Sequence, residues 1–142
     1  MTTIQAPHSP NPHLVTVLIV DDQAQVRFQL RFLLELSGKV IVVGEAADGM
    51  DAVQKASAFQ PDVVLMDLKL PGMNGFQAAR QIKSKNLAHR VVFLSIYASP
   101  EDVQQAREAG ADAYIQKGTP FEDLLENILT DSPNFSSVSE EQ

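Results

Sequence analysis

The sequence predicts one α/β domain built on a doubly wound parallel sheet, and three observations indicate it. Short β-branched apolar runs alternate five times with longer segments of helical periodicity. The apolar runs lack the polar alternation of half-exposed strands, so we expect strands buried on both faces, as in parallel sheets. The chain has 142 residues, 44% of them hydrophobic and 20% charged, which suits a single globular domain.

The expected strands are rich in valine, isoleucine and leucine and are too short for helices. They are Leu14–Val20, Val40–Val43, Val63–Met66, Val91–Leu94 and Ala113–Ile115. Because a helix follows each strand, the strands should run parallel and end at one edge of the sheet. Ligands bind beyond the carboxyl ends of strands in such sheets, so residues at the strand ends are candidates for a site.

The expected helices have recognisable ends. The segment 23–37 carries apolar residues at helical spacing, and Gly38 ends it. Asp48 can cap a second helix, which ends before Pro61. The third helix is expected over 76–85.

The last two helices are expected to begin at proline-containing caps. Ser99 is followed by a proline and two acidic residues, which favours a helix start. Thr119, Pro120 and Glu122 predict a capping box at the start of the fifth helix, with one apolar face over 121–129.

The two termini of the chain and its net charge restrict the possible classes of function. Residues 1–13 hold three prolines and predict a flexible leader, and the polar residues 131–142 predict a disordered tail, which leaves 14–130 as the folded domain. The net charge of -7 disfavours direct binding to nucleic acid or to an anionic membrane. No secretory signal or membrane-length apolar run is visible, so a cytoplasmic location is expected.

Chemically reactive side chains fall at the ends of four expected strands. They are Asp21, Asp22, Asp67, Ser95 and Lys117. Each alone has an ordinary explanation as a turn former, a backbone partner or a surface charge. Their coincidence at matching strand ends favours a site instead. Clustered carboxylates repel one another unless a cation joins them, and an oxygen-only donor set suits Mg²⁺. Asp67 could then attack phosphorus and form an aspartyl phosphate.

Four sequence blocks carry a family resemblance: VLIVDD, DVVLMDLKLPGMNG, VVFLS and GADAYIQKG. Together they resemble the receiver domain of two-component response regulators over roughly residues 15–130. The resemblance implies a flavodoxin-like (βα)5 fold with strand order 2-1-3-4-5. It also implies that the domain takes a phosphoryl group from a histidine kinase or a histidine phosphotransfer protein and switches a protein-interaction face. Such a domain is no enzyme beyond its own phosphorylation and dephosphorylation.

The resemblance also assigns roles to individual residues. Asp67 would be the phosphoacceptor, with Ser95 and Lys117 binding the phosphoryl group and with Ser95 and Tyr114 as the switch pair. A Mg²⁺ site would be formed by Asp22, by Asp67, by Asp21 through a water and by the main-chain carbonyl of Lys69.

Several residues depart from the usual family pattern. Ile96 stands where a small residue is common and is expected to crowd the phosphoryl group. Gly118 replaces a frequent proline. Lys69 and Tyr97 hold positions that tune hydrolysis of the aspartyl phosphate in the family, and neither would hold an attacking water well.

The output of the domain is not specified by the sequence. The resemblance fits a stand-alone receiver or the N-terminal part of a LuxR/NarL-like regulator, with an unknown downstream protein and a possible homodimer through the fourth helix, fifth strand and fifth helix. Two other classes of protein are alternatives. An aspartate-nucleophile phosphatase of the haloacid dehalogenase type needs a second Asp where Lys69 stands. A phosphate-independent interaction module would not need the intact acid set.

Overall fold

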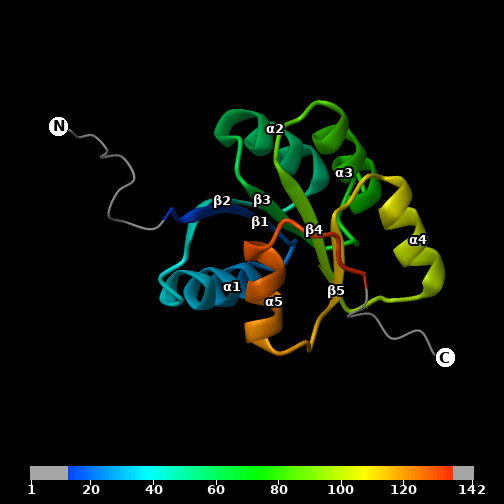
Figure 1. Ribbon diagram of the computed structural model, residues 1–142. Helices are drawn as coiled ribbons and strands as arrows, with labels where there is room; N and C mark the ends of the chain where they lie inside the picture. The colour runs from blue at the N-terminus through cyan, green and yellow to red at the C-terminus, as the bar shows by residue number, and fades with distance from the viewer. Residues whose placement is uncertain (1–12, 136–142) are drawn as a thin grey trace.

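Five parallel strands and five helices make up residues 13–135, the part of the chain described by this computed structural model (Figure 1). The strands are β1 (Val15–Val20), β2 (Val40–Ala46), β3 (Val63–Met66), β4 (Arg90–Ser95) and β5 (Ala113–Gln116). The helices are α1 (Ala24–Leu36), α2 (Gly49–Phe59), α3 (Gly75–Ser84), α4 (Pro100–Glu108) and α5 (Phe121–Leu129). The sheet order is β2-β1-β3-β4-β5 with parallel pairing throughout. The predicted fold class is therefore confirmed.

Helices cover both faces of the sheet. Figure 1 shows α1 and α5 on one face and α2, α3 and α4 on the other. Successive residues of a strand point to opposite faces, and β1 uses both. Leu18 and Val20 belong to the core cluster beneath α2, α3 and α4, whereas Val17 and Ile19 belong to the cluster beneath α1 and α5. This double burial explains why the strands are uninterrupted apolar runs.

The pairing register brings the carboxyl ends of neighbouring strands together. Val20 pairs with Met66, and Met66 pairs with Phe93. The backbone N–H of Asp67 then donates to the carbonyl of Val20 at 2.9 Å. The residues that follow β1 and β3 consequently leave the sheet side by side.

Two predicted helix caps are confirmed and one is wrong. The side chains of Asp48 and Ser99 cap α2 and α4 by accepting backbone N–H groups three residues further on. The capping box expected at Thr119 is not formed. Its hydroxyl donates to the carbonyl of Gln116 at 2.7 Å, so it closes the turn after β5, and α5 has no side-chain cap. A capping box forms instead at Asn74, at the start of α3.

Strand β2 runs three residues beyond the expected 40–43, to Ala46. Gly44 interrupts the apolar run, so the sequence pattern predicts a strand that ends before it. In the fold, a Cβ at Gly44 would lie 2.8 Å from a ring carbon of Phe59, so the aromatic ring fills the space that a side chain would take. Packing from α2 thus supports a strand that the local pattern does not predict.

The chain after α5 differs from the expected disordered tail over 131–142. Residues 131–135, here called the return segment, run along the outer edge of β5, where Asn134 forms a parallel bridge with Ala113. A strand at the edge of a sheet has unpaired N–H and C=O groups, and here Asn134 bonds the N–H of Tyr114 on β5 and the carbonyl of Asp112 just before it. The folded unit therefore extends to at least residue 135.

The remaining terminal predictions lie outside the described residues. They concern residues 1–12 of the leader expected over 1–13 and residues 136–142 of the tail expected over 131–142. None of the helices within residues 13–135 has the length and apolar character needed to cross a membrane.

Close packing between α2 and the loop after β3 gives a stability prediction. A Cβ on Gly49 would lie 2.3 Å from the carbonyl oxygen of Met73. We expect Gly49→Ala to lower the free energy of unfolding by about 1–3 kcal/mol, because the loop must shift to admit the methyl group. Met50→Ala, at a position that is 60% exposed, is the control and should cost less than about 0.5 kcal/mol. Urea denaturation measures both, and equal stabilities would contradict the close approach.

Candidate functional site

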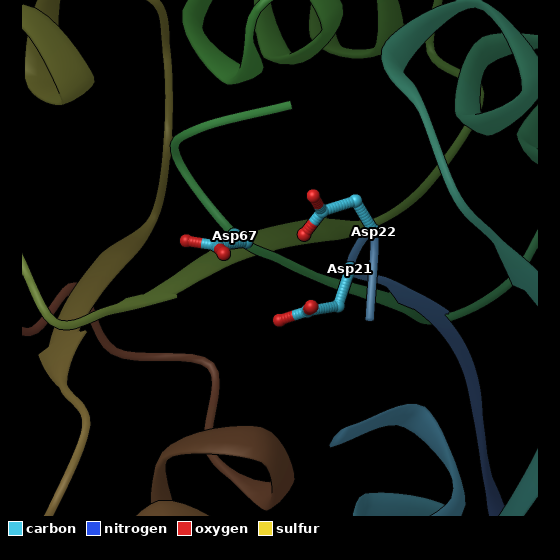
Figure 2. Close-up of side chains that lie close together, drawn as sticks. All are labelled: Asp21, Asp22 and Asp67. Carbon is cyan, nitrogen blue, oxygen red and sulfur yellow. The ribbon is translucent and has the colours of Figure 1, made fainter. Parts of the chain in front are cut away.

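Three carboxylates gather where β1 and β3 end (Figure 2). Asp21 and Asp22 follow β1 and Asp67 follows β3, and one oxygen from each lies within 4.8 Å of the others. Asp21 is 2% exposed and accepts the backbone N–H of Gln23 at 2.9 Å, so its position is fixed. Asp22 is exposed to solvent. The structure thus brings together the three acids that the sequence placed at strand ends.

The predicted lysine reaches the same place from β5. The Lys117 ammonium lies 3.1 Å from Oδ2 of Asp21 and 3.5 Å from Oδ2 of Asp67. The next residue, Gly118, has φ +102°, in the left-handed region. A proline, fixed near about −65°, could not adopt this conformation. Gly118 therefore allows a backbone conformation beside the site that a proline at this position would prevent.

The carboxyl of Asp67 is held in an environment that disfavours its charge. Burial raises its pKa above the ordinary value of 3.8, and the nearby Asp21 carboxylate raises it further. The Lys117 ammonium and hydrogen bonds from the Leu68 backbone and from Ser95 lower the pKa without cancelling the rise. The Leu68 N–H lies 2.7 Å from Oδ1 of Asp67. A group that supplies positive charge nearby, or that neutralises the negative charge, would therefore stabilise Asp67 in this environment.

The donor set of the site consists of oxygen atoms alone. Three carboxylates share the positive charge of one nearby ammonium, that of Lys117. Hard divalent cations prefer oxygen ligands, and Mg²⁺ commonly uses one or two carboxylates together with waters. The acidic cluster therefore fits a metal ion. The Lys69 carbonyl, expected as a further ligand, stays a prediction.

Both residues of the predicted switch pair are buried in the core of the domain. Ser95 is fully buried, and its Oγ accepts the backbone N–H of Tyr97 at 3.2 Å. Tyr114 is also fully buried, its hydroxyl donates to the carbonyl of Tyr97 at 2.5 Å, and its ring centroid lies 5.9 Å from that of Phe93. Burial raises the pKa of Tyr114 to about 12, so its hydroxyl keeps its proton and acts as a donor. The Tyr114 side chain therefore lies inward in this structure, and its role as a switch stays a prediction.

The residues named as departures from the family pattern lie near the surface. Ile96 is 62% exposed, and its expected crowding of the phosphoryl group stays a prediction. Lys69 and Tyr97, named as positions that tune hydrolysis, contact each other, with the lysine Nζ 4.9 Å from the ring centroid. A cation–π contact of this kind holds both side chains in defined places.

Two arginines of α1 support the acidic loop and were missed in the sequence. Arg27 donates to the carbonyl of Asp21 at 2.7 Å and to Oε1 of Glu45 at 3.0 Å, and Arg31 donates to Oε2 of Glu45 at 2.7 Å. Their four-residue spacing on one helix face was visible. Their partner on β2 could be found only from the strand order.

Comparison with known proteins places this geometry in a family. The family model for the response regulator receiver domain matches residues 17–129. The chain is 36% identical over 118 residues to the nitrate/nitrite response regulator protein NarL of Escherichia coli K12, which covers 83% of this chain and 55% of that protein. It is 42% identical over 123 residues to the transcriptional regulatory protein PdtaR of Mycobacterium tuberculosis, covering 87% and 59%. The chain thus spans little more than half of these relatives.

Solved structures agree with the sequence relatives. The signal receiver domain of the response regulator NarL from Mycobacterium tuberculosis superposes with a TM-score of 0.79 at 36% identity, covering 83% of this chain and 95% of that one. A LuxR-family two-component response regulator from Aurantimonas gives 0.79 at 32% identity, covering 87% and 91%.

The raised pKa of Asp67 predicts how the site affects stability in the absence of divalent cations. Its folded pKa lies above the unfolded value, so the folded state loses stability as the pH rises through that interval. Asp67→Asn, which stays neutral, should therefore have the higher free energy of unfolding at pH 7. The difference should shrink as the pH falls toward the unfolded pKa of about 3.9. Urea titrations in EDTA measure it, and a less stable variant at pH 7 would contradict the sign.

Proposed function

Because this chain belongs to the receiver domain family of two-component response regulators, we propose that Asp67 is the residue through which it is phosphorylated. The observation that supports this most directly is the environment of the Asp67 carboxylate. The carboxylate is buried enough for its pKa to rise, it lies 3.5 Å from the Lys117 ammonium, and it adjoins two further acids. Lys117 is placed to neutralise oxygen atoms of a group attached to Asp67.

The proposed reaction is an in-line displacement at phosphorus. An oxygen of Asp67 forms a bond to the phosphorus of a phosphohistidine as the P–N bond breaks, and the imidazole keeps the electron pair and then takes a proton from water. Phosphoryl transfer depends mostly on positioning and charge neutralisation. The Leu68 N–H, 2.7 Å from Oδ1, fixes the orientation of the carboxylate. The histidine belongs to a sensor kinase or a phosphotransfer protein, which is the proposed input partner.

We propose Mg²⁺ as the cofactor, held by Asp22, by Asp67 and by the Lys69 carbonyl, with Asp21 contributing through water. Bound there, the ion supplies positive charge to the oxygens around phosphorus. Asp22 suits the main role because it is exposed and has no hydrogen bond or ion pair with another described residue. Asp21 suits a secondary role because Gln23 and Lys117 already occupy its two oxygens.

The proposed output is a change in the population of two states. Ser95 would bond the phosphoryl group, and Tyr114 would stay inward, bonded to the Tyr97 carbonyl as it is in this structure. The face made by α4, β5 and α5 then takes the conformation that a downstream protein or a second copy of the chain binds. Raising a rare state to dominance requires roughly 5 kcal/mol of differential binding, which a few charge-assisted hydrogen bonds can supply.

The site assignment predicts a labelling pattern. With Mg²⁺ and acetyl phosphate, the wild type should gain a phosphoryl group, and Asp67→Asn should gain none because its amide is not a nucleophile. Asp51→Asn removes a carboxylate of α2 that is paired with Lys55 at 3.0 Å, and it should label like the wild type. Intact-protein mass spectrometry gives the readout, and circular dichroism checks the fold. Wild-type labelling of Asp67→Asn would remove Asp67 from the proposed role.

The contact between Lys69 and Tyr97 predicts a long-lived aspartyl phosphate. We expect neither side chain to hold an attacking water well, and the contact between them restrains both. We expect the phosphoryl group to persist for minutes or longer after removal of acetyl phosphate, measured by a mass-spectrometric time course. Loss within seconds in the absence of any phosphatase would overturn this expectation.

A further inference from the structure

The return segment is bonded to the backbone of the switch residue itself. The N–H of Tyr114 donates to the carbonyl of Asn134, and the N–H of Asn134 donates to the carbonyl of Asp112, both at 3.0 Å. These two bonds hold the segment in register with Ala113 on the outer edge of β5. The backbone of Tyr114 is therefore fixed by the segment, while its side-chain hydroxyl is bonded to the carbonyl of Tyr97, in the loop before α4.

A buried cation anchors the segment at its start. Arg90 is 2% exposed, and its guanidinium donates to the carbonyls of Ser132 at 3.0 Å and Asn127 at 3.1 Å. No carboxylate among residues 13–135 forms an ion pair with it. A buried charge without acceptors is costly, so the need of Arg90 for carbonyl oxygens favours the docked segment. The side chain of Asn134 adds a hydrogen bond to that of Asn127, on α5.

An aromatic residue anchors the other end of the segment. The guanidinium carbon of Arg107, on α4, lies 4.3 Å from the ring centroid of Phe135. Phe135 also packs against the core cluster that contains Tyr114, Val103 and Ala106. The return segment thus contacts α4, β5 and α5, the same three elements that form the proposed output face.

We propose that the return segment is a latch that favours the inward position of Tyr114, so that its docking and the phosphorylation of Asp67 strengthen each other. The proposal rests on the proposed function, because it takes Tyr114 as the switch. With the segment docked, the backbone of Tyr114 is fixed and Phe135 closes the apolar cluster that holds the tyrosine ring. With the segment released, both restraints are lost. Coupling between two equilibria is reciprocal, so each event must favour the other by the same factor.

The full chain with Phe135→Ala tests the latch without any ligand, and Phe32→Ala, which removes an exposed phenyl ring from α1, is the matched control. In Phe135→Ala we expect hydrogen exchange at the Tyr114 and Asn134 amides to become at least about fivefold faster. The nuclear Overhauser effect between the Tyr114 and Phe93 rings should weaken. Phe32→Ala should leave both unchanged. Unchanged exchange in Phe135→Ala, or faster exchange with an unchanged ring contact, would overturn the proposal.

Beryllofluoride with Mg²⁺, a phosphoryl analogue, tests the coupling. In the wild type it should slow exchange at the Tyr114 and Asn134 amides, and Phe135→Ala should bind it at least about fivefold more weakly than Phe32→Ala does. Equal beryllofluoride affinities of the two variants would mean that the return segment only covers the edge of β5, and this result would overturn the proposal. If the wild type failed to bind beryllofluoride, the proposed function would fall. The ligand-free exchange and ring contact would then still decide whether the segment restrains Tyr114.

Discussion

The ammonium group of Lys117 lies between two carboxylates that would otherwise repel each other, those of Asp21 and Asp67. The three residues follow three different strands, so the contact exists only because β1, β3 and β5 end at one edge of the sheet. It also ties the loop after β5 to the phosphoacceptor candidate. Burial raises the pKa of Asp67, the Asp21 carboxylate raises it further, and the Lys117 ammonium does not cancel the rise. Three carboxylates beside this ammonium leave an excess of negative charge, which makes the site receptive to a cation.

Much of the fold could be predicted from local sequence because the local preference of each segment agrees with its place in the fold. The strands were visible because both of their faces are buried, and the caps at Asp48 and Ser99 were visible because a side chain caps its own helix. The misses have the opposite character. The length of β2 depends on a ring from α2 that packs against Gly44, and the role of Thr119 depends on where β5 ends. Phe59 is remote from Gly44 in the sequence, and Thr119 bonds a carbonyl only three residues before it because β5 ends at Gln116.

The contacts of the site likewise divide into those that the sequence predicts and those that it does not. Its acids and its lysine could be predicted because the parallel topology brings strand ends together, whatever the details of packing. The supporting contacts could not. Arg27 reaches a backbone carbonyl at Asp21, and the Tyr114 hydroxyl reaches one at Tyr97. A backbone acceptor is present at every position of a chain, so no residue type marks the one that is used. Only the three-dimensional path of the loops selects it.

The return segment bears on how the protein should be produced as a recombinant fragment. The family match ends at residue 129, and a fragment cut there would follow common practice. It would leave the Arg90 guanidinium without the Ser132 carbonyl and would open the outer edge of β5 where Asn134 pairs with Ala113. Open strand edges pair with other chains and promote aggregation. For this protein, the hydrogen bonds of Ser132 and Asn134 and the packing of Phe135 extend the folded unit beyond the end of family similarity, and a fragment for crystallisation or spectroscopy should include them.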